Sequence, residues 1–243
     1  MLEKTMPIVM CTYSRLDRLP FTLSQLTMQI GCTIEVFIWN NNLEGRELID
    51  ATIKLYPQLR VTVHHSEHNI GGFGRFYFAR RISSQYSSVI FIDDDVNLKN
   101  NAISTLIKEF EPQTIHSFYA FKFKTKEDYF KRKRLKAGEE ADYCGTGGVI
   151  CDTTIYKEKG LFQCPKEYWF IEDLWLSYYA SHVLGWKLYK SKAEIKLIED
   201  GKNQWVELKN LKTEFLQYLI RQGWDVANGT YGLHERILCR LGR

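Results

Sequence analysis

Strand-like and helix-like segments alternate through the first hundred residues, and this alternation limits the folds open to the chain more than any other feature. Short apolar runs predict strands at Pro7–Tyr13, Glu35–Trp39, Arg60–His64 and Ser88–Ile92, and helical spacing separates them at Leu19–Ile30, Glu47–Tyr56 and Arg75–Tyr86. Strands that alternate with helices of about ten residues indicate βαβ units. We therefore predict an α/β, Rossmann-like fold with a mostly parallel central sheet flanked by helices.

The second half of the chain is less regular. It predicts strands at Ser117–Lys124, Tyr143–Cys151 and Lys187–Tyr189, and helices at Trp169–Leu184 and Val206–Ile220. Because no linker or repeat interrupts the chain, we predict one domain over residues 1–243, with halves at 1–100 and 101–190 and a C-terminal helical extension at 191–243. The last helix is amphipathic, which favours docking on the core, with membrane contact or dimerisation as alternatives.

Composition argues against several classes of protein. The net charge of +4 is too small to favour nucleic acid as a partner, but it suits an anionic small ligand such as a nucleotide diphosphate. None of the six cysteines forms a C-x-x-C pair, which argues against zinc and favours buried, reduced thiols. Residues 1–7 are charged and polar without a long apolar stretch, so we expect a cytoplasmic protein.

Three adjacent aspartates, Asp93, Asp94 and Asp95, follow the apolar strand Ser88–Ile92. Adjacent carboxylates repel one another, and a hard divalent cation relieves that repulsion because carboxylate oxygens are its preferred ligands. The alternative is a solvated acidic turn. Ligands of parallel α/β sheets bind at the carboxyl ends of the strands, where these aspartates lie. We therefore predict a Mn²⁺ or Mg²⁺ site that keeps open positions for diphosphate oxygens.

A second acidic pair, Glu172 and Asp173, lies near the start of a predicted helix. The helix N-terminus stabilises carboxylates, which by itself would explain the pair. Alternatively, one of them is a general base that takes a proton from an acceptor hydroxyl. The aromatic residues just before the pair, Trp169 among them, would then form a platform for an acceptor sugar.

A glycine-rich segment, His68–Arg75, follows the third predicted strand. Its glycines allow close approach of the backbone to a ligand, and Arg75 suits a phosphate or a sugar. The spacing differs from the dinucleotide fingerprint G-x-G-x-x-G, and a simple turn is the alternative.

The basic stretch Lys122–Lys136 also has two interpretations. The first is a solvated, mobile loop. The second is contact with an acceptor, either a lipid-linked diphosphate or an anionic membrane surface that carries it, which would make the protein peripheral to a membrane. No nucleic-acid module surrounds the stretch, so we expect no nucleic-acid partner.

Over roughly residues 7–190 these segments resemble the family-2-like glycosyltransferases of the GT-A fold. The order and spacing of the motifs carry the resemblance. MPIVMCTYSR and EVFIWNNN are similar to the first two strands, HNIGGFGRFYFARR to the N-x-G loop, VIFIDDDV to the D-x-D motif, YCGTGGVI to the glycine-bearing acceptor strand and WFIEDLWLSYYA to the ED helix. The resemblance implies a single GT-A domain that acts in glycan synthesis.

The resemblance also implies roles for the matched residues. A nucleotide-diphosphate sugar, in the first instance a UDP-sugar, would be bound by Thr12, Tyr13, Arg15, Asn40, Asn69, Gly71, Arg75, Asp93 and Asp94. The family usually has Asp at the position of Asn40. The metal would be held by Asp93 and Asp95, with Asp200 or the more distant His234 as the third protein ligand.

On the acceptor side, Asp173 would be the base, with Glu172 as the next candidate, and Gly147, Gly148 and Trp169 would contact a glycan or lipid-linked acceptor. One carboxylate base acting alone implies transfer with inversion. Two other functions compete: a sugar-1-phosphate nucleotidyltransferase, and a non-catalytic nucleotide-sugar or carbohydrate-binding module. The first would need a Gly- and Lys-rich loop after the first strand, where this chain has TYSRLDR, and the intact acidic motifs argue against the second.

Overall fold

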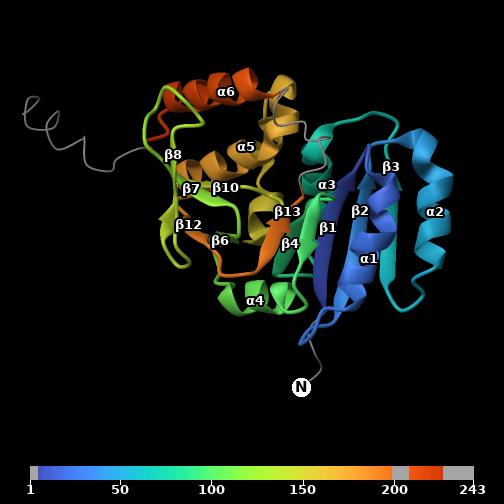
Figure 1. Ribbon diagram of the computed structural model, residues 1–243. Helices are drawn as coiled ribbons and strands as arrows, with labels where there is room; N and C mark the ends of the chain where they lie inside the picture. Colours follow the sequence, from blue (N-terminus) through green and yellow to red (C-terminus); the bar gives the residue numbers. More distant parts are fainter. Residues whose placement is uncertain (1–4, 199–207, 227–243) are drawn as a thin grey trace, which may run out of the picture.

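The computed structural model describes residues 5–198 and 208–226, which form a mixed α/β structure around one large sheet (Figure 1). Within these residues the sheet has eight strands in the order β3-β2-β1-β4-β11-β6-β12-β9. Their bounds are β1 (Met6–Thr12), β2 (Ile34–Asn40), β3 (Arg60–His65), β4 (Ser88–Ile92), β6 (Thr114–Ser117), β9 (Glu140–Ala141), β11 (Val149–Asp152) and β12 (Lys187–Lys190).

The first four strands of the chain pair in parallel, as their alternation with helices predicts. Met10 of β1 lies opposite Ile38 of β2 and Ile92 of β4, and β3 continues the parallel arrangement on the outer side of β2. Strand β11 runs antiparallel between β4 and β6, and β12 is parallel to β6. The sheet is therefore mostly parallel, and it contains strands from both halves of the chain.

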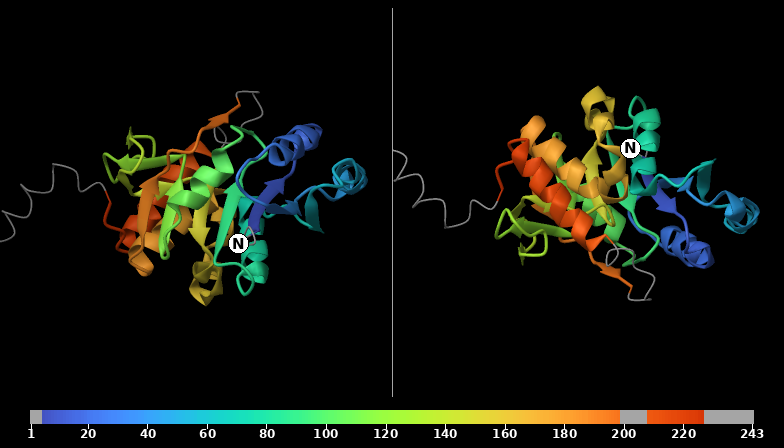
Figure 2. Two further views of the ribbon diagram at one scale, coloured as in Figure 1. Left: turned by 90° about the horizontal axis from the view of Figure 1, so that it is seen from below. Right: turned by 90° about the horizontal axis from the view of Figure 1, so that it is seen from above.

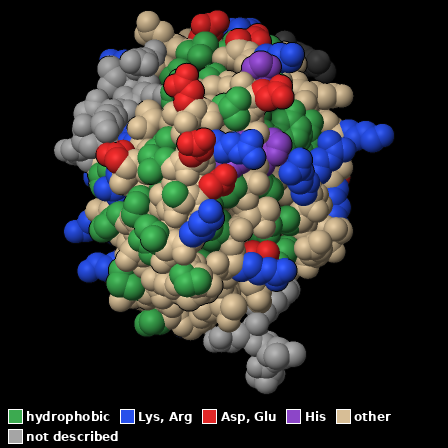
Figure 3. Space-filling view, turned by 90° about the vertical axis from the view of Figure 1, so that its right-hand side faces the viewer, with side chains coloured by type: hydrophobic (Ala, Val, Ile, Leu, Met, Phe, Trp, Pro, Cys, Tyr) green, Lys and Arg blue, Asp and Glu red, His purple; other side chains and the backbone are tan. Residues whose placement is uncertain are grey.

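Helices cover both faces of the sheet because successive strand side chains point to opposite faces. Ile8 and Met10 are fully buried on the face covered by α1 (Leu19–Thr27), α2 (Arg46–Lys54) and α4 (Ala102–Glu109). Val9 and Phe37 are buried on the other face, against α3 (Gly74–Ile82). Figure 2 shows α1 and α3 on opposite sides of β1. On the outer surface near α2 and β3, charged side chains of both signs are mixed with apolar ones (Figure 3).

Two predicted strands are each divided in the structure. The segment Ser117–Lys124 contains the end of β6 and all of β7 (Ala120–Phe123), and Tyr143–Cys151 contains β10 (Tyr143–Cys144) and most of β11. Strands β10, β7 and β8 (Arg132–Arg134) form a separate small sheet. The glycines between β10 and β11 allow this change of sheet, because a Cβ on Gly148 would lie 2.5 Å from the side chain of Ile195.

The helices of the second half also differ from the prediction. The predicted Trp169–Leu184 helix consists of a 3₁₀ segment at Lys166–Ile171, the α-helix α5 (Glu172–Tyr178) and a π-helical turn at Tyr179–Val183. The last described helix, α6 (Lys209–Arg221), packs on the core as expected, and its Phe215 stacks on Tyr168 with ring centroids 3.9 Å apart.

Two findings limit the remaining expectations. Within 5–198 and 208–226, none of the helices combines the length and apolar character needed to cross a bilayer. The prediction of one domain over the whole chain stays a prediction, because residues 199–207 and 227–243 lie outside the described part.

Strands β5 (Val96–Leu98) and β13 (Ile195–Leu197) pair beside the three aspartates.

Candidate active site

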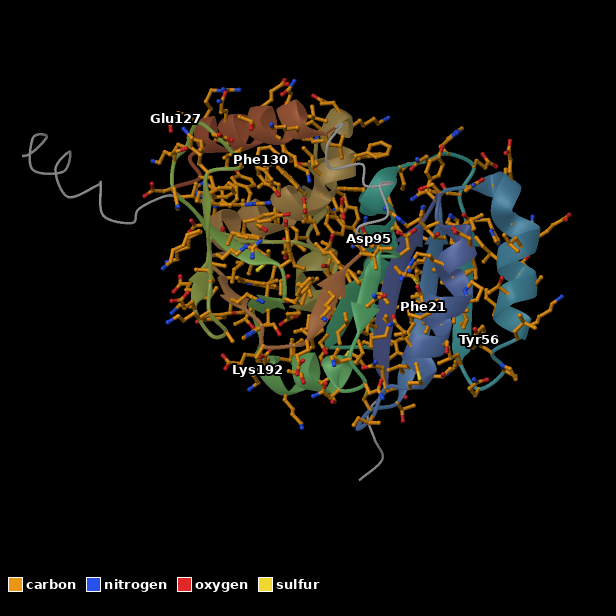
Figure 4. The ribbon with its side chains drawn as sticks, in the orientation of Figure 1. Phe21, Tyr56, Asp95, Glu127, Phe130 and Lys192 are labelled. Carbon is orange, nitrogen blue, oxygen red and sulfur yellow. The ribbon has the colours of Figure 1, made fainter. Side chains whose placement is uncertain are left out.

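Polar side chains from several segments gather at the carboxyl ends of β1 and β4 and line a cavity of about 240 Å³, which we name the strand-end cleft. All but one of the residues predicted to bind the donor line this cleft: Thr12, Tyr13, Arg15, Asn69, Gly71, Arg75, Asp93 and Asp94. The predicted metal ligand Asp95 and the acidic pair Glu172 and Asp173 line it too. Figure 4 shows Asp95 near the middle of the molecule, between its two halves.

Arg75 is the residue that joins these motifs. Its side chain is 5% exposed, and Nη2 donates to Asp93 Oδ1 at 2.8 Å while Nε lies 3.3 Å from Glu172 Oε1. The guanidinium also donates to the carbonyl oxygens of Gly72 and Thr146, both at 3.2 Å. The two carboxylates raise the pKa of Arg75, against the lowering effect of burial, so the group is a permanent cation. It therefore holds both acidic motifs in place.

The middle aspartate of the three is held by the loop that follows β1. Asp94 accepts hydrogen bonds from Thr12 Oγ1 at 3.3 Å and Arg15 Nη1 at 3.4 Å, and Arg18 Nε donates to its backbone carbonyl at 3.2 Å. Burial raises the pKa of Asp94 to about 6, and the adjacent Asp93 adds to the rise while Arg15 opposes it. Asp94 therefore connects the loop after β1 to the end of β4.

Asp95 and Asp93 have oxygens that suit a divalent cation. The Oδ1 atom of Asp95 is buried and accepts no hydrogen bond, and Asp93 keeps 34% of its side chain exposed while one oxygen bonds Arg75. Burial raises the pKa of Asp95 to about 7, and the neighbouring carboxylates add to the rise. A cation would reverse this effect, because it stabilises the charged carboxylates.

The donor set is incomplete within the described residues, where no cluster of three or more acidic, His or Cys side chains has an arrangement suited to a metal. Asp93 and Asp95 therefore fit a cation that takes its remaining ligands from substrate oxygens and water, as Mg²⁺ commonly does. The predicted third ligand, Asp200, and its alternative, His234, lie outside the described residues.

The two members of the acidic pair lie in different surroundings. Glu172 is 4% exposed, pairs with Arg75 and accepts a hydrogen bond from Thr146 Oγ1 at 3.1 Å. Burial raises its pKa to about 7, although Arg75 opposes the rise. A Cβ on Gly72 would lie 2.0 Å from Glu172 Oε1, so the glycine loop leaves room for this carboxylate. Glu172 is thus an internal partner of Arg75.

Asp173 is half-buried and lines two cavities at once. The second cavity, of about 600 Å³, has an aromatic wall and is named here the aromatic groove. It shares five lining residues with the strand-end cleft: Asp93, Asp95, Thr146, Asp173 and Lys212. The buried hydroxyl of Tyr143 donates a short hydrogen bond to Asp173 Oδ2 and so fixes the carboxylate where the two cavities meet.

Local sequence pattern does not locate the aromatic groove. Its wall is formed by Phe118, Tyr119, Tyr129, Phe130 and Tyr143, together with Arg132, Arg134 and Lys212. These side chains come from the small sheet, the loops around it and α6, which are brought together only by folding. The alternation of Tyr119, Phe121 and Phe123 along the chain was the one local sign that a second apolar surface would form here.

Several predicted site residues lie elsewhere. Asn40 is fully buried, its side-chain amide forms hydrogen bonds with Asn42 and His65, and it does not line the cleft. Its neighbour Asn41 does line the cleft. The Asn41 amide donates to the carbonyl oxygen of Gly71 at 2.9 Å and so holds the glycine loop. The ring of Trp169 stacks on Phe73 with centroids 4.9 Å apart.

On the acceptor side, Trp169 lines neither cavity, whereas the next residue, Phe170, lines the strand-end cleft. Gly147 lines the aromatic groove, where a Cβ would lie 2.6 Å from Asp93 Oδ2. Gly148 instead faces Ile195. None of the five cysteines within the described residues forms a disulfide, and Cys144, Cys151 and Cys164 are buried.

The parallel sheet, the acidic cleft at its carboxyl edge and the antiparallel strand beside it define a protein of the GT-A fold. The family model described as "Glycosyl transferase family 2" matches residues 8–166, which is more than half of the chain. The chain therefore belongs to glycosyl transferase family 2. A search of curated proteins found no match.

Solved structures with the same fold include three glycosyltransferase complexes. The mannosyltransferase PcManGT from Pyrobaculum calidifontis, with GDP-Man and Mn²⁺, has a TM-score of 0.65 and 12% identity over 89% of this chain and 63% of that chain. TarS 1-349 from S. aureus, with UDP, has a TM-score of 0.54 and 18% identity, and the match covers 79% of this chain and 60% of that chain. GalNAc-T7, with UDP, GalNAc and Mn²⁺, has a TM-score of 0.60 and 15% identity, and the match covers 84% of this chain and 46% of that chain. The chain thus spans less than two thirds of each of these structures.

Proposed function

We propose that the protein transfers a hexose from a nucleotide-diphosphate sugar to a hydroxyl group of a glycan or lipid-linked acceptor, with inversion and with a divalent cation. The observation that carries the proposal is the position of Asp173, which lines both the strand-end cleft and the aromatic groove. A single carboxylate at this junction can take a proton from an acceptor in the groove while the donor occupies the cleft.

The donor would lie along the strand-end cleft. Thr12 ends β1 and Tyr13 follows it, where they suit the nucleoside. The glycine loop at Asn69–Gly72 allows close approach of a ligand to its backbone. GDP-Man or UDP with Mn²⁺ in the similar structures supports a nucleotide-sugar donor here, and UDP is the first nucleotide to test. Asp93 and Asp95 would hold the cation, which supplies positive charge for the leaving diphosphate.

Other side chains would take part in proton transfer and in positioning. Asp173 accepts the proton of the acceptor hydroxyl, and the Tyr143 hydroxyl fixes the orientation of this carboxylate. Glu172 is occupied by Arg75 and Thr146, so we assign it to positioning and not to proton transfer. Arg75 keeps Asp93 and the start of α5 in a fixed relation.

The experiment compares Asp173→Asn with Glu127→Gln, a control at an exposed carboxylate at the edge of the molecule that lines neither cavity (Figure 4). With the nucleotide sugar that thermal shift selects from a panel, transfer or donor hydrolysis should fall by about 10²-fold or more in Asp173→Asn. Nucleotide affinity should stay unchanged, because the cavity keeps its shape. Wild-type turnover in Asp173→Asn would remove this residue from the role of base.

Metal dependence is tested separately. Nucleotide binding, measured by titration calorimetry, should require Mn²⁺ or Mg²⁺ and should be lost in Asp95→Ala. Equal affinity in the presence of a chelator would contradict the metal-dependent form of the proposal. Binding without any turnover would instead favour a non-catalytic module, and release of inorganic diphosphate from a sugar phosphate and a nucleoside triphosphate would favour a nucleotidyltransferase.

A further inference from the structure

The aromatic groove continues beyond Asp173 into a side pocket of about 480 Å³. The groove and the side pocket share six lining residues: Phe118, Tyr119, Phe130, Arg132, Arg134 and Leu197. A ligand that reaches Asp173 with one end can therefore extend along the aromatic rings into the side pocket.

Some side chains of the basic stretch 122–136 line this path and others do not. Arg132–Arg134 is the strand β8, which pairs antiparallel with β7, so its side chains alternate between two directions. Arg132 and Arg134 line both the groove and the side pocket, and Lys133 lines neither. The solvated-loop interpretation is therefore wrong for Arg132, and strand pairing explains why.

Arg132 carries its charge among aromatic rings. Its guanidinium carbon lies 4.2 Å from the ring centre of Phe121 and 4.4 Å from that of Tyr129, and Nη2 donates to Tyr119 Oη at 3.1 Å. Its Nη1 atom is buried and has no hydrogen-bond partner. Among the described residues, no carboxylate forms an ion pair with Arg132 or Arg134. Among the residues that the structure describes, the positive charge of Arg132 is therefore stabilised by ring faces and by a neutral hydroxyl.

Lys190 adds a third cation to the side pocket. Its ammonium group contacts two neutral acceptors, the carbonyl oxygens of Phe118 and Ser191, and lies 5.5 Å from the ring centre of Phe118. The charge of Glu109 acts on Lys190, but this carboxylate is bound to Ser191 Oγ and to the backbone of Lys192, outside the pocket lining.

The described carboxylates of the path lie at one of its ends. Asp93, Asp95 and Asp173, with the cation Lys212 in the same lining, lie at the end where transfer would occur. The described lining of the side pocket contains Arg132, Arg134 and Lys190 and no carboxylate. An anion in the side pocket would meet three cations that form no ion pair with a carboxylate among the described residues, and it could accept charge-assisted hydrogen bonds that a neutral group could not match.

Building on the proposed transfer reaction, we propose that the acceptor is anionic. It carries a phosphate or carboxylate group that the side pocket binds through Arg132, Arg134 and Lys190. Its sugar lies along Tyr119 and Phe130, with the reacting hydroxyl toward Asp173. The charged residues that line the path thus specify the sign of the acceptor's charge. They also specify that this charge lies at the end of the acceptor away from the reacting hydroxyl.

The test uses three sugars with one ring and different charges: glucose, glucose 6-phosphate and glucuronate. Each is titrated calorimetrically into the full chain in the presence of UDP and Mg²⁺. At least one of the anionic sugars should bind about tenfold or more tightly than glucose, the usual scale for a hydrogen bond between charged groups. Preference for glucose 6-phosphate would identify a phosphate-bearing acceptor, and preference for glucuronate a carboxylate-bearing one.

Two variants locate the effect. Arg134→Gln changes an exposed side chain of the side pocket and should remove most of the preference for the anionic sugar, with less effect as salt rises. Lys133→Gln is the matched control, because it removes the same charge from the adjacent residue, which lines neither cavity. Equal affinity for the three sugars, or equal losses in the two variants, would overturn the inference.

These outcomes are distinct from failure of the proposed function. UDP binding and donor hydrolysis depend on the strand-end cleft, which contains neither Arg134 nor Lys133. Intact UDP binding without anion preference would reject only the anionic acceptor. A wild-type protein that does not bind UDP would contradict the proposed function, and the sugar titrations repeated without UDP would still show whether the side pocket selects anions.

Discussion

Arg75→Met removes the cation that both acidic motifs share, and its effect on stability follows from the burial of the pair. Arg75 and Glu172 have side-chain exposures of 5% and 6%. Removal of one member of a buried ion pair costs about 3–5 kcal/mol, because the other charge remains buried without compensation. Asp93 is less affected because water reaches a third of its side chain. We therefore expect Arg75→Met to lose about 3–5 kcal/mol of unfolding free energy at pH 8.

The loss should depend on pH in a defined direction. The pKa of Glu172 is raised above its ordinary value of 4.5, mainly by burial, and Arg75 opposes the rise. Without Arg75 the folded-state pKa rises further, so the folded variant holds a proton on Glu172 that the unfolded chain releases. Stability then falls as the pH rises from about 4.5 through the new folded-state pKa. The variant should therefore lose less stability at pH 5.5 than at pH 8.

Urea unfolding of the wild type, Arg75→Met, Glu172→Gln and the double variant at both pH values measures these differences. The double variant should recover part of the loss at pH 8, because a neutral amide replaces the uncompensated carboxylate. A loss below about 1 kcal/mol at pH 8, which is the scale of a surface ion pair, would refute the argument. So would a loss that is the same at both pH values.

Two further substitutions test the contacts around the acidic pair. Tyr143→Phe removes the hydrogen bond to Asp173 and should lower kcat by about tenfold while the donor KM stays the same, measured by steady-state kinetics; an unchanged kcat would show that Tyr143 does not position the base. Gly72→Ala places a Cβ 2.0 Å from Glu172 Oε1 and should reduce stability by about 1–3 kcal/mol in urea unfolding. An unchanged midpoint there would mean that the glycine loop can move aside.

The sequence predicted the part of the site that depends on local pattern. Apolar runs that end in polar residues identified β1 and β4, and parallel pairing then required Thr12 and Asp93–Asp95 to lie at one edge. Asn40 and Asn41 show the limit of this argument, because which of two adjacent amides faces the cleft depends on the loops that pack around them. Both residues are asparagine, so residue type does not distinguish them.

The contacts between distant segments could not be predicted in the same way. The bonds of Arg75 to Asp93 and Glu172 join residues separated by 18 and 97 positions, and Arg75 was expected to face a ligand. The sequence predicts Trp169 at an acceptor platform, but its ring stacks on Phe73. Whether an aromatic side chain is exposed to a ligand or buried is decided by packing, which the residue type does not specify.

The path of the chain between β6 and β11 has a consequence for how such proteins diverge. These two strands are hydrogen-bonded neighbours in the main sheet, with Ile115 opposite Cys151. Apart from β9, which pairs with β12 at the edge of the main sheet, residues 118–148 therefore leave that sheet and return to it beside the point of departure. They carry the aromatic rings from Phe118 to Tyr143 and both arginines of β8. Most of the aromatic wall of the groove, where the proposed acceptor would lie, thus comes from one continuous segment of the chain. Transplanting it between relatives should carry acceptor preference with it and leave the nucleotide preference of the recipient unchanged.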